Sequence, residues 1–147
     1  MPIKGSCHCR ATQFEVDEAP ARIMRCTCSF CSKRGALWAY YTPQQFKLTT
    51  ARDRVSTYQW RTYTVEHHHC SICGCGTYTE SPEWVDGKPD FTRLKIGINA
   101  RLLDDFDVDA VPVQVLDGKK SLVAALSGRC RAGSGCRRPC HSPCRPR

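Results

Sequence analysis

Hydrophobic and polar residues alternate along several short segments of the chain. Between Ala11 and Val16, apolar or threonine side chains occupy every second position. A period of two is typical of a strand with one buried face. Similar patterns, with β-branched and aromatic residues, predict further strands over Leu37–Tyr41, Val55–Trp60, Tyr63–His68, Leu94–Ile98 and Val111–Leu116.

Turn-forming residues separate these segments. They occur at Pro43, Asp53-Arg54, Ser81-Pro82, Asp86-Gly87-Lys88-Pro89 and Asp117-Gly118. Helical structure is expected only as short turns, near Gln44–Phe46 and Asp104–Asp109. The pattern therefore predicts a mostly β domain of short antiparallel strands.

The length and composition fit one small domain. The chain has 147 residues, of which 41% are hydrophobic, and this is enough for a core. It lacks the run of about 18 apolar residues that a spanning helix needs. The first nine residues also lack the charged and then apolar pattern of a secretory leader. We therefore expect no membrane span and a cytoplasmic location.

The net charge of +8 is concentrated at the C-terminus. Residues 128–147 contain six arginines and no acidic residue, so they account for six of the eight net charges. Ala132 is their only aliphatic side chain, and such a segment cannot bury enough surface to fold. We predict a folded domain over 1–127 and a disordered basic tail over 128–147. The tail can attract nucleic acid electrostatically, but no groove-reading motif accompanies it, so a nucleic-acid partner is not expected.

Cysteine is the most informative residue type. The chain has twelve, and the eight before the tail fall into three groups, at Cys7-His8-Cys9, Cys26–Cys31 and Cys70–Cys75. Without a secretory leader or a βαβ pattern, disulfides and a thioredoxin-like motif are disfavoured. Short spacings let one turn supply two or three thiolates to a zinc ion, so the groups indicate zinc sites.

Eight cysteines permit two arrangements. They can form two closed four-sulfur sites, or one closed site and one three-sulfur site with a spare cysteine. A closed site is structural, whereas three protein ligands leave a position for water or substrate. The middle group can place three sulfurs on one metal, and the outer groups would then share another zinc that fastens the first strand to a late hairpin.

Several motifs resemble those of the glutathione-dependent formaldehyde-activating enzyme and centromere protein V family. The similarity covers about residues 5–120. The matching segments are the G-S-C-H-C of Gly5–Cys9, the C-x-C-S-x-C of Cys26–Cys31, the R-G-A-x-W-A-Y of Arg34–Tyr40, the E-H-H-x-C-x-x-C-G of Glu66–Gly74, the N-x-R-x-L-D of Asn99–Asp104, and the V-P-V and Asp-Gly turn of Val111–Gly118.

The resemblance implies a β-tent fold and two zinc ions per chain. It places a structural zinc on Cys7, Cys9, Cys70 and Cys73, and a second, open zinc on Cys26, Cys28 and Cys31. It also implies that glutathione and formaldehyde are the substrates. The implied activity is that of a carbon-sulfur lyase similar to S-hydroxymethylglutathione synthase. The residues alone indicate thiol chemistry, since a thiol that binds zinc at an open position is held as a thiolate, ready to attack a small carbonyl.

The chain departs from the family pattern at two positions. His69 stands where the family often has Phe, and Cys75 adds a thiol beside the third group. If Cys75 reached the middle zinc, it would close that site and remove the open position.

Other residues near the motifs have both functional and structural interpretations. Arg25, Lys33 and Arg34 can meet the carboxylates of glutathione or simply face solvent. Trp38, Tyr40 and Tyr41 can line a cleft, although aromatic strand residues are more often core. At most two of the histidines at 67–69 can converge on a metal because strand residues alternate faces, and they are expected instead to support Cys70 through hydrogen bonds.

Three functions remain open at this point. The first is a zinc-dependent enzyme or glutathione carrier that joins a thiol to a small aldehyde. The second is a non-catalytic adaptor in which both metals only hold the fold. The third, a nucleic-acid binder, rests almost entirely on residues 128–147 and ranks last.

Overall fold

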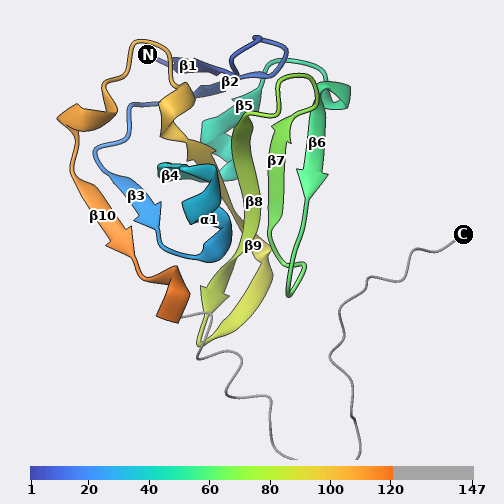
Figure 1. Ribbon diagram of the computed structural model, residues 1–147, viewed down its shortest axis with the longest axis vertical. Helices are drawn as coiled ribbons and strands as arrows, with labels where there is room; N and C mark the ends of the chain where they lie inside the picture. The colour runs from blue at the N-terminus through green and yellow to red at the C-terminus, as the bar shows by residue number, and fades with distance from the viewer. Residues whose placement is uncertain (121–147) are drawn as a thin grey trace, which may run out of the picture.

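A computed structural model describes residues 1–120, and the predicted tail therefore lies outside the described residues. The described part is mostly β (Figure 1). Its elements are β1 (Ile3–Ser6), β2 (Gln13–Val16), β3 (Ile23–Cys26), α1 (Ser29–Arg34), β4 (Trp38–Tyr41), the 3-10 helix η1 (Pro43–Gln45), β5 (Phe46–Leu48), η2 (Arg52–Arg54), β6 (Val55–Tyr58), β7 (Glu66–Cys70), β8 (Gly76–Val85), β9 (Lys88–Asn99), η3 (Ala100–Leu102), η4 (Val108–Ala110) and β10 (Val113–Leu116). None of the described helices is long and apolar enough to cross a membrane.

The strands form two sheets. The smaller sheet has the order β1-β2-β5, and the larger has the order β10-β3-β4-β9-β8-β7-β6. All the pairs are antiparallel except β10 with β3, which run parallel. The β8–β9 hairpin extends beyond the rest of the larger sheet (Figure 1). The prediction of a mostly β domain is confirmed, while the parallel pair and the long hairpin strands differ from the expected short antiparallel strands.

The core is built from strand residues that share one face. In β4, Ala39 and Tyr41 are buried in the main apolar cluster, whereas Trp38 packs in a second cluster and Tyr40 is partly exposed. This is the alternation expected of a strand covered on both faces by different layers. The main cluster consists of Phe14, Val16, Ile23, Leu37, Ala39, Tyr41, Tyr78, Ile96, Ile98, Ala100 and Leu103.

One predicted break lies inside a strand. Ser81 and Pro82 belong to β8, and the pairing with β9 shifts register between Pro82 and Glu83. Proline has no N–H to donate to a ladder, so a register shift lets the strand continue past it. The predicted turn at Asp86-Gly87 is the tip of this hairpin, where both residues adopt a positive φ.

Candidate metal centres and cleft

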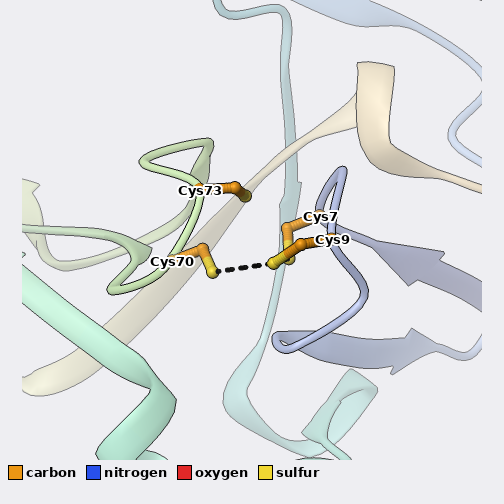
Figure 2. Close-up of side chains that lie close together, drawn as sticks. All are labelled: Cys7, Cys9, Cys70 and Cys73. Atoms are coloured by element: carbon orange, nitrogen blue, oxygen red, sulfur yellow. Dashed lines mark hydrogen bonds between the residues drawn. The ribbon is translucent and has the colours of Figure 1, made fainter.

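Four cysteines from distant parts of the sequence meet between the two sheets. Cys7 and Cys9 lie in the loop between β1 and β2, Cys70 ends β7, and Cys73 lies in the turn before β8. Their sulfurs all lie within 4.8 Å of one another. Figure 2 shows the four side chains converging from the two loops. We call this group the four-sulfur cluster.

The geometry of this cluster fits a zinc ion. The Sγ atoms of Cys7 and Cys9 are 3.7 Å apart, and those of Cys9 and Cys70 are 3.6 Å apart. A tetrahedron with Zn–S bonds of about 2.3 Å has S–S edges of about 3.8 Å, whereas a disulfide would need about 2.05 Å. Backbone N–H groups of Thr12 and Ile72 donate to the sulfurs of Cys7 and Cys70, as in zinc-thiolate sites.

A second group of sulfurs forms where β3 runs into α1. Cys26 ends β3, Cys28 is the N-cap of α1, and Cys31 lies in its first turn. Their sulfurs also lie within 4.8 Å of one another. The Cys28 sulfur accepts the N–H of Cys31 at 3.4 Å, so the helix cap and the metal ligand are the same side chain. We call this group the sulfur triad.

Hydrogen bonds favour negative charge on the triad. The Cys31 thiol and the backbone N–H groups of Cys28 and Gly118 lower the pKa of Cys26 to about 5. The Cys31 thiol donates its hydrogen bond to the Cys26 sulfur, and this bond together with burial raises the pKa of Cys31. The indole Nε1 of Trp38 donates to the Cys31 sulfur at 3.3 Å. The triad therefore carries a thiolate at neutral pH, which is the form that binds metal.

Cys75 lies with the four-sulfur cluster and not with the triad. Its thiol hydrogen-bonds with Cys73 and accepts the backbone N–H of His8. No fourth Cys, His, Asp or Glu ligand joins the triad within residues 1–120. The arrangement in which Cys75 closes the middle site is therefore not the one observed.

A cleft opens beside the triad on the larger sheet. Its volume is about 580 Å³, and its floor is the sheet face that carries Met24 and Cys26 on β3, Trp38 and Tyr40 on β4, and Lys95 on β9. The loop over residues 60–65 and the outer part of β8 form its walls. The other lining residues are Cys28, Cys31, Trp60, Arg61, Thr62, Thr64, Val65, His67, Thr79, Ser81, Pro82, Trp84, Leu116 and Gly118.

The positive charge at the cleft comes from residues that the sequence did not single out. Lys95 lies 5.1 Å from the centre of the Tyr40 ring, and Arg61 lies 5.5 Å from the Trp60 ring. None of Arg25, Lys33 and Arg34 lines the cleft. Arg34 instead packs over the ring of Phe30.

The three consecutive histidines point in alternating directions, as expected. His67 packs against Phe30 with ring centres 4.1 Å apart and lines the cleft. Burial, reinforced by the nearby charges of Arg34 and His68, lowers the pKa of His67 to about 4. Within the described residues, no hydrogen bond joins a histidine of this run to the Cys70 sulfur, so the expected supporting role is not observed.

His68 belongs to a separate buried network. Its Nδ1 lies 2.9 Å from the hydroxyl of Thr57, and its Nε2 lies 3.2 Å from a carboxylate oxygen of Glu80. Arg52 donates to the same Glu80 oxygen at 3.0 Å. The close approach of His68 and the hydrogen bond from Arg52 lower the pKa of Glu80. The spacing expected of metal ligands also occurs at Glu66, His68 and Glu80. Here, however, Arg52 already compensates the negative charge of Glu80.

Gly118 is a site residue that the sequence suggested only as part of a turn. A Cβ added here would lie 2.5 Å from the Cys26 sulfur and 3.0 Å from Cys28 Cβ. The parallel pairing of β10 with β3 brings this glycine to the triad. The need for a small residue depends on that long-range pairing, so no local pattern could have revealed it.

The fold and the sulfur clusters define a mostly β domain with cysteine sites suited to metal. A family model described as glutathione-dependent formaldehyde-activating enzyme matches residues 2–115, and the chain belongs to this family.

Proteins of Halomonas elongata and Rhodobacter sphaeroides are among those similar to this chain. A protein of Halomonas elongata, provisionally named a glutathione-dependent formaldehyde-activating enzyme, is 31% identical over 95 residues. That match covers 58% of this chain and 60% of the relative, so the chain aligns with less than two thirds of its length. A crystal structure of a Rhodobacter sphaeroides protein from a structural genomics programme superposes with a TM-score of 0.61 at 29% identity, covering 76% of this chain and 99% of the other.

Proposed function

We propose that this protein binds glutathione at a zinc ion held by Cys26, Cys28 and Cys31 and adds it to formaldehyde, as a carbon-sulfur lyase-type enzyme. The observation that carries the proposal is the sulfur triad at the edge of the cleft, with three ligands and no fourth among the described residues. Three protein ligands are typical of catalytic zinc, which keeps one position for substrate.

A second zinc, bound by Cys7, Cys9, Cys70 and Cys73, completes the proposal as a structural ion. Its support is the tetrahedral S–S spacing, together with the origin of the ligands in segments that adjoin strands of both sheets. All eight described cysteines are free thiols, which fits a reducing compartment such as the cytoplasm.

Zinc bound at the triad would lower the pKa of the incoming thiol. The sulfur then attacks the aldehyde carbon, a C–S bond forms, and the carbonyl electron pair moves to oxygen, which takes up a proton. Lys95 and Arg61 give the cleft positive charge for the two carboxylates of glutathione. The Trp38 N–H draws charge from the Cys31 sulfur and fixes its position.

The test is the rate of S-hydroxymethylglutathione formation with zinc-loaded protein. We expect a faster reaction than in buffer, near-complete loss of the acceleration in Cys28→Ser, and retention in Cys75→Ser, which changes a thiol outside the triad. Equal rates with wild type and Cys28→Ser would contradict the enzymatic proposal. That result would favour the alternative, a binding or adaptor module in which both metals are structural.

A further inference from the structure

The cleft is much larger than an aldehyde of two heavy atoms requires. Its volume of about 580 Å³ lies within the range of about 300–1,000 Å³ that is typical of sites for drug-sized ligands. Its lining includes no Asp or Glu within the described residues, and Arg61 and Lys95 are its charged side chains apart from the sulfur triad. The electrostatics therefore fit an anion such as glutathione, but the charge does not explain the rest of the lining.

Apolar side chains surround the position next to the triad. Met24 precedes Cys26 by two residues on β3, so the two share a face and lie about 7 Å apart along the strand. Leu116 is the direct partner of Cys26 in the parallel β10–β3 pair, and it is 44% exposed. Tyr40 extends this surface across β4.

The Tyr40 ring has a defined place on the floor of the cleft. It packs over Gly97, where an added Cβ would lie 3.0 Å from Tyr40 Cε1 and 2.7 Å from the hydroxyl oxygen of Thr79. Lys95 covers the ring at 5.1 Å. Removing apolar surface from water is favourable. An exposed apolar surface beside a thiol-binding position therefore stabilises a complex in which the bound substrate covers it.

We propose that, besides formaldehyde, the site accepts aldehydes that carry an apolar group of about phenyl size, which packs against Met24, Tyr40 and Leu116. This inference rests on the proposed function, because it places the thiol sulfur at the triad. The reaction is the same addition: the sulfur bonds to the aldehyde carbon, and the oxygen gains a proton to give a hemithioacetal. The apolar group remains bonded to that carbon and lies next to the triad.

Calorimetric titration of the zinc-loaded full chain with two blocked thiols tests the apolar subsite. S-methylglutathione and S-benzylglutathione share the peptide and lack a free thiol, so they differ only in the group on sulfur. Partial burial of the phenyl ring should make S-benzylglutathione bind about tenfold more tightly. Equal affinities, or no binding of S-benzylglutathione, would overturn the inference.

A matched pair of variants locates the subsite. Leu116→Ser should lower the preference for the benzyl compound about threefold and leave S-methylglutathione binding unchanged. Val115→Ser changes the neighbouring residue of β10, which is 57% exposed and does not line the cleft, and should preserve the preference. A preference that survives Leu116→Ser, or falls equally in Val115→Ser, would refute this placement.

Failure of the proposed function gives a different result. A benzyl preference without acceleration of the formaldehyde reaction would contradict the enzyme activity while retaining the apolar subsite. Acceleration with formaldehyde but no benzyl preference would contradict only the inference about the electrophile.

Discussion

The backbone of Gly118 lies directly against the sulfur of Cys26, where an added Cβ would approach to 2.5 Å. The backbone N–H of Gly118 also donates to that sulfur. In Gly118→Ala, the sulfur or the loop must move, because the neighbouring Cys28 backbone cannot yield easily. We expect the affinity for the second zinc to fall at least about tenfold, as for other changes to groups that support metal ligands. A competitive chelator titration measures it.

Lys119→Ala is the control for this variant, since it changes an exposed residue of the same helical turn. It should leave the affinity for both metals unchanged. If Gly118→Ala bound two zinc ions as tightly as the wild type, the close packing of Gly118 on the triad would be of no consequence for the site.

The indole of Trp38 offers a second test of the triad. Trp38→Phe keeps an aromatic ring but removes the N–H that donates to Cys31. We expect about tenfold weaker binding of the second zinc and a loss of about 1–2 kcal/mol in the free energy of unfolding from the smaller ring. Trp60→Phe makes the same chemical change in a ring that packs against Phe30 and should retain zinc affinity. Equal zinc affinities in the two variants would exclude a role for the indole N–H.

The strands that the sequence predicted best are those in which apolar, aromatic or β-branched residues recur at short intervals. Alternation located β2, β4 and β6, with ends that differ by one or two residues. In contrast, β8 buries Thr77, Tyr78 and Thr79 in succession, so it has no period of two, and its proline suggested a break. Helix α1 has only six residues and depends on the Cys28 cap, which a periodicity search cannot detect.

The cysteine groups were predictable because zinc ligands follow short local spacings. The residues that shape the cleft are different, since Lys95 and Gly118 reach it only through pairing between distant strands, β9 with β4 and β10 with β3. Likewise, the position of Cys75 beside Cys73 depends on the direction of the turn after β7. Local sequence thus indicates the metal chemistry, while tertiary structure decides what surrounds it.

His67 should make stability depend on pH. Burial lowers its pKa to about 4 in the folded protein, whereas a histidine in an unfolded chain has a pKa of about 6.5. The unfolded state therefore binds more protons between these values, and stability falls as the pH decreases from 6.5 toward 4. The His67→Phe variant lacks this contribution of His67 to the pH dependence of stability. Urea unfolding of zinc-loaded protein should show the variant gaining up to about 1 kcal/mol relative to the wild type between pH 6.5 and 5.5. A constant difference over this range would show that the pKa of His67 is the same in the folded and unfolded states.

Removing one sulfur from each cluster should have different consequences. The four-sulfur cluster connects the β1–β2 loop to the turn after β7, and structural zinc contributes free energy of folding directly, about 10–16 kcal/mol for a whole site. Cys73→Ala should therefore lower the free energy of unfolding by several kcal/mol and reduce zinc from two ions to one. Cys28→Ala should lose the other zinc and the activity with a smaller effect on stability, while Cys75→Ala should keep both ions. Zinc analysis and thermal unfolding measure these outcomes, and a greater loss of stability in Cys28→Ala than in Cys73→Ala would mean that the structural and catalytic assignments must be exchanged.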